Sequence, residues 1–343
     1  MAPTFADVLP IKRLSSHTYS VVLEEAWAIG AVPNGGYVTS AFLMVARAHM
    51  SETHPRRNSP HPVNLHLEFL RRTSASEAFF TVQDVKLGAR ISNLHITLSQ
   101  RRDPDQPKIE DKVTGYVMMS NIATETGLSL QTEYTLQPPP LQTNLKVLAD
   151  KLVDDNYVVR GKDPFEAFRR AVVNIQMFLL RADRKEHAHL PISVNDQWVR
   201  FSPGGTPNGR WTNDALGFLV DMFPQTIERY INDEGEKAAI AVATGQTTPV
   251  TPSKIPPKAP YWYPTLVLNL DVKKLLPEEG VEWLFVRVRA KKIQNGRFDL
   301  DIEVWDEAGD LVATSVHAAL VVDAARNLAG RTPSSKAKGE SKL

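Results

Sequence analysis

The stretch PNGRWTNDALGFLVDMF at residues 207–223 has a counterpart, PNGGYVTSAFLMVARAHM, at residues 33–50. Both begin with Pro-Asn-Gly and continue into an apolar run, which predicts a turn followed by a buried helix. Asn34 and Asn208 are 174 residues apart (208 − 34 = 174). The match indicates an internal duplication, and a repeat of this kind decides the architecture of a chain.

The segments that follow the two predicted helices also match in order. Each helix leads into a strand, then a hairpin, then a final strand, as the alternation of apolar residues indicates. The predicted strands and hairpins cover 62–70, 79–100 and 112–119 in one half, and 264–272, 283–306 and 311–322 in the other. A helix followed by antiparallel strands, present twice, predicts an α+β protein.

The boundaries of the two halves follow from composition. Three successive prolines at 138–140 cannot lie inside a sheet, so they mark a surface linker. A Pro/Thr/Lys-rich insertion at 231–260 is predicted to be a partly ordered surface loop. The predicted parts are an N-terminal half (1–120), a linker (121–165), a C-terminal half (166–323) and a flexible tail (324–343).

Composition excludes several classes of function. The net charge of +1 offers no general attraction for nucleic acid, and no apolar run is long enough to span a membrane. The chain has no cysteine, so disulfides and thiol nucleophiles are excluded. Motifs for a serine hydrolase elbow, a dinucleotide or a P-loop are absent, and no cofactor is expected. His187 and His189 are the one close pair of histidines in a polar loop, and no metal site is predicted.

The chain ends in Ser341-Lys342-Leu343, after a stretch rich in Ser, Lys and Gly. A C-terminal Ser-Lys-Leu on a solvated tether is a peroxisomal targeting signal. We therefore expect recognition by the peroxisomal import receptor and a location in the peroxisomal matrix.

Five segments together resemble the TesB-type acyl-CoA thioesterases, which have a double-hotdog fold. They are NGGYVTSAFL (34–43), HLEFLRR (66–72), DQWVRF (196–201), LGFLVDMF (216–223) and LVATSVHAAL (311–320). Arg72 stands where the family usually has proline. The resemblance implies two hotdog repeats, each a sheet wrapped around a helix, and hydrolysis of acyl-CoA to a free acid and CoA. It also implies a homo-oligomer, because exposed hotdog sheet edges commonly pair between chains in this family.

The resemblance implies three catalytic residues in the C-terminal half, Asp221, Thr265 and His317, which would hold the attacking water. His317 departs from the family, which has glutamine there, so it would act as a titratable base or mark a site put to another use. Asp221 is also unusual in itself, because an acid in an apolar run near a helix C-terminus opposes the helix dipole. Arg47 stands at the matching position of the first half (221 − 174 = 47), which predicts one site per chain.

Substrate-binding residues are expected at the two helix starts and on one strand. Backbone N–H groups near Gly35-Gly36 or Asn208-Gly209 would stabilise a developing oxyanion, and His66 belongs to the family's H-x-x-F-L-R segment. The candidate partners for the CoA phosphates are Arg71, Arg72, Lys291, Lys292 and Arg297.

Two alternative functions stay open. One is an enzyme that processes or releases an acyl thioester in a specialised pathway. The other is a hotdog subunit that binds acyl-CoA without turning it over. The histidine at 317, in place of the family's glutamine, is the reason to consider this alternative.

Overall fold

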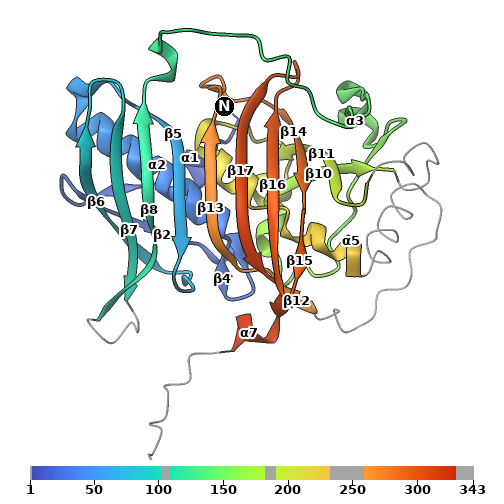
Figure 1. Ribbon diagram of the computed structural model, residues 1–343. Coiled ribbons are helices and arrows are strands. Elements are labelled where there is room, and N and C mark those ends of the chain that lie inside the picture. Colours follow the sequence, from blue (N-terminus) through green and yellow to red (C-terminus); the bar gives the residue numbers. More distant parts are fainter. Residues whose placement is uncertain (1, 102–107, 182–190, 232–258, 330–343) are drawn as a thin grey trace, which may run out of the picture.

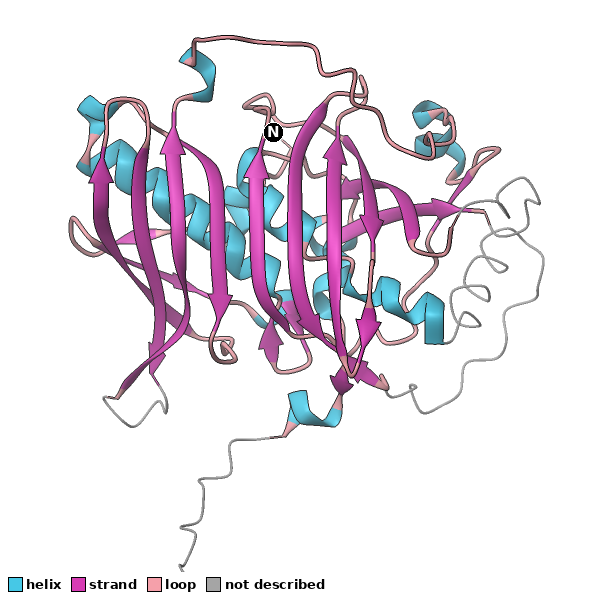
Figure 2. Ribbon diagram, viewed as in Figure 1, coloured by secondary structure: helices cyan, strands magenta, loops and turns pink. Residues whose placement is uncertain are grey.

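The computed structural model of the chain describes residues 2–101, 108–181, 191–231 and 259–329. Within these residues, fourteen strands form one antiparallel sheet that curves around two helices (Figure 1). Figure 2 shows that the longer helices lie on one side of this sheet and leave its other face uncovered.

The first half contains one long helix and four long strands. Its elements are α1 (Phe5–Val8), β1 (Lys12–Arg13), β2 (Thr18–Val22), β3 (Ala28–Ile29), β4 (Val32–Pro33), α2 (Gly35–Thr53), β5 (His61–Phe69), β6 (Glu77–Leu87), β7 (Ser92–Arg101) and β8 (Ile109–Ser120). The predicted strand, hairpin and final strand correspond to β5, β6 with β7, and β8.

The second half repeats this order with additions at both ends. Its elements are α3 (Leu145–Lys151), β9 (Tyr157–Val159), β10 (Ile175–Leu180), β11 (Val194–Phe201), α4 (Leu216–Val220), α5 (Glu228–Ile231), β12 (Tyr261–Trp262), β13 (Thr265–Val272), β14 (Trp283–Arg289), β15 (Ile293–Gln294), β16 (Arg297–Trp305), β17 (Leu311–Leu320), β18 (Val322–Asp323) and α7 (Ala325–Leu328). The predicted strands of this half correspond to β13, β14 with β16, and β17.

The two halves are joined through their sheets. The strand order is β1-β2-β6-β7-β8-β5-β13-β17-β16-β14-β11-β10-β9, so β5 of the first half pairs with β13 of the second. Leu65 faces Leu270 and Leu67 faces Leu268 across this junction, and all four are buried. The α+β double-hotdog arrangement that the sequence predicted is therefore confirmed.

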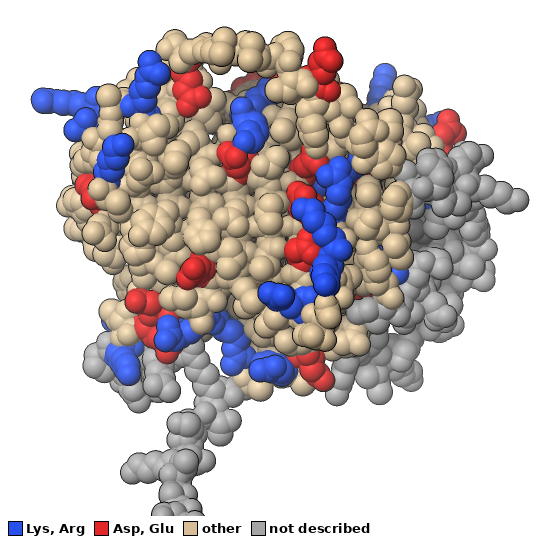
Figure 3. All heavy atoms as spheres, viewed as in Figure 1, with Lys and Arg blue, Asp and Glu red and all other residues tan. Residues whose placement is uncertain are grey.

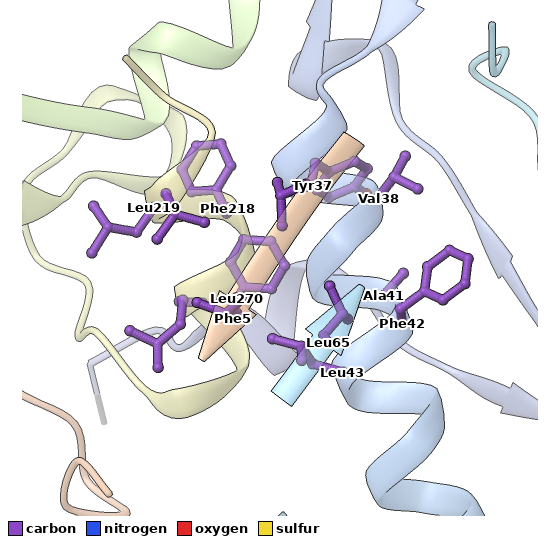
Figure 4. Close-up of a cluster of buried hydrophobic side chains, with 14 of the residues drawn as sticks. Phe5, Tyr37, Val38, Ala41, Phe42, Leu43, Leu65, Phe218, Leu219 and Leu270 are labelled. Atoms are coloured by element: carbon purple, nitrogen blue, oxygen red, sulfur yellow. The ribbon is translucent and has the colours of Figure 1, made fainter. Parts of the chain in front are cut away.

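The helix α2 is buried on all sides along most of its length. Every residue from Gly36 to Ala46 is buried, as expected for a helix wrapped by a sheet and not merely resting on one. Figure 4 shows side chains of α2, α4, β5 and β13 in one cluster, with Phe5 of α1 among them. One hydrophobic core thus contains residues of both halves.

The second helix is shorter than the sequence predicted. A 3-10 turn at Asn213–Ala215 precedes α4, so residues 207–212 are not helical. Trp211 instead forms two backbone hydrogen bonds with Val281, and the Gly209 N–H donates to Phe201 O. The two Pro-Asn-Gly motifs are therefore not equivalent in space, since Asn34 caps α2 and Asn208 lies in a turn.

The linker and the tail also differ from their predicted limits. β9 lies within the predicted linker, yet it pairs with β10 and extends the sheet. The tail was expected to be flexible from residue 324, but α7 is ordered and Asn327 is buried against Ile29 and Ala31. The rest of the tail, most of the 231–260 insertion and the pair His187 and His189 lie outside the described residues. Among the described residues, no helix is long and apolar enough to cross a membrane.

Candidate functional site

A cavity of about 290 Å³ opens where the N-terminus of α2 meets the residues that follow α4. Its walls come from both halves of the chain. The lining residues are Ile29, Val32, Pro33, Asn34, Gly35, Phe69, Leu70, Arg71, Arg72, Thr73, Arg169, Val172, Asp221, Met222, Pro224, Tyr261, Trp262, Tyr263, Pro264, Thr265 and Leu266. Among the expected catalytic residues, Asp221 and Thr265 therefore face the cavity.

Asp221 is held by donors from the opposite half of the molecule. Its Oδ2 accepts hydrogen bonds from the Gly36 N–H at 2.8 Å and from Asn34 Nδ2 at 3.2 Å. Its Oδ1 accepts a hydrogen bond from Thr265 Oγ1 at 2.8 Å. A carboxylate offers about four lone-pair positions, so these three bonds leave one acceptor position on Oδ1.

The environment of Asp221 raises its pKa but leaves the carboxyl group ionised at neutral pH. The side chain is 3% exposed, and burial raises the pKa of Asp221 from 3.8 to about 6, although the bonds from Thr265, Gly36 and Asn34 lower it. The carboxylate also lies at the positive end of the 19-residue helix α2, which favours negative charge there. A carboxylate with a pKa near 6 is ionised at neutral pH and is a stronger base than an ordinary aspartate.

His317 contacts Asp221 from within the protein and does not line the cavity. It is 1% exposed, and burial lowers the pKa of His317 to about 3, so the ring is neutral. Its Nε2 lies 2.9 Å from Ser315 Oγ, which donates its only hydrogen to Asn269 O at 2.6 Å. The His317 Nε2 must therefore carry the ring proton and donate it to Ser315.

This tautomer places the lone pair of His317 Nδ1 toward Asp221 Oδ1, at 3.5 Å. With a neutral ring, the contact is between two acceptors and is not an ion pair. A hydrogen placed between them, from a water molecule or from a protonated Asp221, would satisfy both atoms. The free lone pair of Asp221 Oδ1 therefore lies beside a second proton acceptor, the Nδ1 atom of His317.

The corresponding position in the first half holds an ion pair. Arg47 Nη2 lies 2.6 Å from Asp214 Oδ2, at the other end of the contact between α2 and α4. Asp214 is buried, and burial raises its pKa, whereas the Arg47 charge lowers it. A basic residue thus stands where the second half has its buried acid.

Several residues expected to bind a ligand lie elsewhere. His66 is on the outer face of the sheet, where its Nδ1 lies 2.7 Å from Asn269 Oδ1, because Leu65 and Leu67 take the inward positions of the alternating strand. Asn208 and Gly209 are not among the cavity-lining residues, because the second helix begins after them.

At the α2 helix start, the Gly36 N–H is already used by Asp221. The Gly35 N–H faces no acceptor within the described residues, and Gly35 lines the cavity. It is the helix N-terminal donor that stays available to a ligand.

The expected basic residues separate into two groups. Arg71 and Arg72 line the cavity, and Arg72 Nη1 donates to the Arg326 carbonyl oxygen at 2.8 Å. Lys291 pairs with Asp301 at 2.7 Å, and Lys292 and Arg297 line a different depression near β15. Of the expected basic residues, Arg71 and Arg72 are therefore the two that an anionic group in the cavity could meet.

Sequence reasoning missed two contributions to the cavity. Asn34 was noted only as the start of a repeat, yet its side chain caps α2 and donates to Asp221. Arg169 and Tyr263 also line the cavity, and both side chains donate to Glu228. The aromatic run Tyr261-Trp262-Tyr263, which Pro264 separates from Thr265, was the available signal.

Comparison with known proteins agrees with this arrangement. The acyl-CoA thioesterase N-terminal domain matches residues 23–120, and the acyl-CoA thioesterase C-terminal domain matches residues 158–321. The thioesterase-like protein TwmA of Talaromyces wortmannii is 33% identical over 97% of this chain and 96% of its own length.

Solved structures resemble the whole chain at low identity. A hot dog fold protein from Alicyclobacillus acidocaldarius has a TM-score of 0.63 at 18% identity, covering 93% of this chain and 97% of its own. The acyl-CoA thioesterase II TesB2 from Mycobacterium marinum has a TM-score of 0.55 at 15% identity, covering 93% and 98%. These likenesses support the double-hotdog fold.

Proposed function

Since the chain belongs to the acyl-CoA thioesterase family and is a thioester hydrolase, we propose that it cleaves acyl-CoA by direct attack of water on the thioester. The observation that carries this proposal is the buried Asp221 carboxylate, which faces the cavity with a raised pKa and one free acceptor position. No nucleophilic side chain is required.

Asp221 is proposed as the general base. A water molecule donates one hydrogen to the free lone pair on Oδ1, and Thr265 fixes the same oxygen through its hydroxyl. As the water oxygen bonds to the thioester carbon, its proton passes to Asp221 and the carbonyl oxygen becomes an oxyanion. A positioned base of this kind contributes about 10²–10⁴ in rate.

The reaction then needs a proton for the leaving thiolate. When the tetrahedral intermediate collapses, the C–S bond breaks, the acid is released and the CoA sulfur leaves as a thiolate. A thiol has a pKa of about 8.5, so Asp221, with its pKa of about 6, can return the proton to sulfur. The same carboxyl group thereby acts first as base and then as acid.

The oxyanion would be stabilised at the start of α2. The Gly35 N–H lines the cavity and keeps its hydrogen available, and the helix dipole adds to its field. The CoA phosphates would lie at the rim, where Arg71 and Arg72 present guanidinium groups.

The decisive experiment measures CoA release from a panel of acyl-CoAs of different chain length. Asp221→Asn should lower kcat by about 10²–10⁴-fold, because an amide cannot accept the proton. The matched control is Asp214→Asn, which alters another buried aspartate at the same helix contact but outside the cavity; it should keep near wild-type kcat. Unchanged turnover in Asp221→Asn would refute the site.

The same panel separates the alternatives. Binding of acyl-CoA without release by the wild-type chain would favour a binding subunit. Release restricted to one unusual acyl group would favour an enzyme of a specialised pathway over one of general fatty-acid breakdown.

For location, we propose import into the peroxisome through Ser341, Lys342 and Leu343, which end the sequence. A fluorescent protein fused in front of the full chain should concentrate in peroxisomes, and removal of the last three residues should leave it diffuse. The same distribution with and without these residues would contradict the proposal.

For assembly, we propose a homo-oligomer formed through the outer face of the sheet. Tyr116, His66, Asn269 and Val316 lie side by side across four neighbouring strands, and Tyr116 and Val316 are exposed. Figure 3 shows few charged side chains over this part of the face, whereas they gather over β16. Light scattering should give a multiple of 38.2 kDa for the wild type and the monomer mass for Tyr116→Arg.

A further inference from the structure

A cluster of metal-ligand side chains lies in the N-terminal half, far from Asp221. It consists of His17, His49, His54 and Asp84, whose ligand atoms all lie within 4.8 Å of one another. His49 and Gly36 are 13 positions apart on α2 (49 − 36 = 13), which places them about 20 Å apart along the helix axis. The proposed reaction uses none of these four residues.

Three separate elements bring the cluster together. His17 immediately precedes β2, and its carbonyl accepts from the Val82 N–H of β6. On β6 the inward positions are Ala78, Phe80 and Val82, and Asp84 continues this face at a bulge. The last turns of α2 cover that position with His49 and His54.

The three imidazoles converge on one carboxylate. The Nε2 atoms of His17 and His54 lie 3.2 and 2.8 Å from Asp84 Oδ2, and His49 Nε2 lies 2.9 Å from Oδ1. A tetrahedral zinc ion with bonds of about 2.0–2.1 Å holds its ligand atoms about 3.3 Å apart. Small changes in side-chain torsion would therefore admit an ion between them.

The hydrogen bonding of His49 suits a metal ligand. Its Nδ1 lies 3.1 Å from the Ser16 carbonyl oxygen and 3.3 Å from the Tyr19 hydroxyl, and its Nε2 lies 2.9 Å from Asp84. The Ser16 carbonyl oxygen can only accept, so a ring that donates its Nδ1–H to this oxygen turns the Nε2 lone pair toward the other ligand atoms of the cluster. With an ion on Nε2, a neutral ring donates Nδ1–H to Ser16, as metal-bound histidines commonly do.

We propose that His17, His49, His54 and Asp84 form a structural site for a divalent transition-metal ion of the zinc class. Three nitrogens and one carboxylate oxygen suit such an ion, and four protein ligands leave no open position for catalysis. The ion would fasten the C-terminal end of α2 to β2 and β6. The partly exposed His17 and His54 give it a route from solvent.

The test uses the untagged full-length chain, incubated with zinc and then dialysed. Mass spectrometry of the metal content should find about one zinc per chain in the wild type. His54→Gln should retain none, although its amide can still donate to Asp84 as the histidine does. Zinc at 1,000 times its Kd should raise the wild-type Tm by about 5 °C and leave that of His54→Gln unchanged.

The matched control is His95→Gln, a partly buried histidine on β7 that bonds Thr114; it should behave as the wild type. In chelator, the Tm values of all three proteins should agree within about 2 °C, which shows that the variants fold. Retention of equal zinc by wild type and His54→Gln, or no zinc and no Tm response in the wild type, would overturn the site.

Discussion

Asp221 looks misplaced on its own helix and well placed in the folded molecule. It caps the C-terminal end of α4, where the helix dipole disfavours negative charge. In space it faces the N-terminus of α2, which supplies the Gly36 N–H and the Asn34 amide. The pKa of Asp221 is raised because the effect of burial is larger than the effect of these donors. The carboxylate is therefore a stronger base than an exposed aspartate.

The pH dependence of activity should report this group. The base must be ionised, so kcat/KM should rise tenfold per pH unit below about 6 and level off above it. His317 should add no limb between pH 5 and 9, because burial lowers its pKa to about 3. A steady-state pH profile tests both statements, and an activity limb near pH 4 would contradict the assignment to Asp221.

The same carboxylate should reduce stability at neutral pH. The pKa of Asp221 is 3.8 when unfolded and about 6 when folded, so the folded state binds the proton more tightly. Stability therefore falls as pH rises from 3.8 to about 6, by about 3 kcal/mol in total. At pH 7.5, Asp221→Asn should be more stable than the wild type by up to about 3 kcal/mol. Urea unfolding would show this, and a strongly destabilised variant would contradict it.

His317→Gln tests the residue that departs from the family. A glutamine amide can donate to Ser315 as the neutral imidazole does, and its oxygen can take the acceptor position of Nδ1. We expect kcat to stay within about tenfold of the wild type. A loss as large as that of Asp221→Asn would show that the histidine ring has a role of its own.

At the scale of elements, the site depends on how closely α2 and α4 approach. A Cβ on Gly36 would lie 2.6 Å from Gly217 O and 2.7 Å from Asp221 Cβ, so the helices meet through glycine. The Phe218 N–H donates to Ser40 Oγ across the same contact at 2.9 Å. Close packing of the helices thus holds the Gly36 N–H on the carboxylate.

Gly36→Ala should therefore impair stability and activity together. Forcing a methyl group into this contact costs about 1–3 kcal/mol and moves the Gly36 N–H away from Asp221. The thermal unfolding temperature and kcat should both fall. Ser51→Ala, on the exposed surface of the same helix, should leave both unchanged. Normal activity in Gly36→Ala would show that the contact is more tolerant than its geometry indicates.

At the scale of the whole molecule, the two halves form one folding unit. β5 pairs with β13, and one hydrophobic cluster includes Phe42 of the first half and Phe218 of the second. Calorimetry should give a single unfolding transition, because neither half can lose its core without exposing the other. Two separate transitions would contradict this, and so would an active C-terminal half expressed alone.

The sequence by itself determined the duplicated architecture and the identity of the unusual acid. The alternation of apolar residues in β5, β8, β13 and β17 is local information, since every second side chain of a strand points to the same face of the sheet. An aspartate among Leu219, Val220, Met222 and Phe223 was likewise visible without coordinates.

Only the tertiary structure decided which groups meet. Two of the three donors to Asp221, the Gly36 N–H and the Asn34 amide, lie 185 and 187 residues away, and no local pattern relates such positions. Matching Asn208 to Asn34 failed because Trp211 pairs with Val281, a contact between distant segments. The cluster of three histidines and Asp84 could not be predicted for the same reason. Its side chains converge only after the start of β2, the end of α2 and the bulge of β6 have packed together.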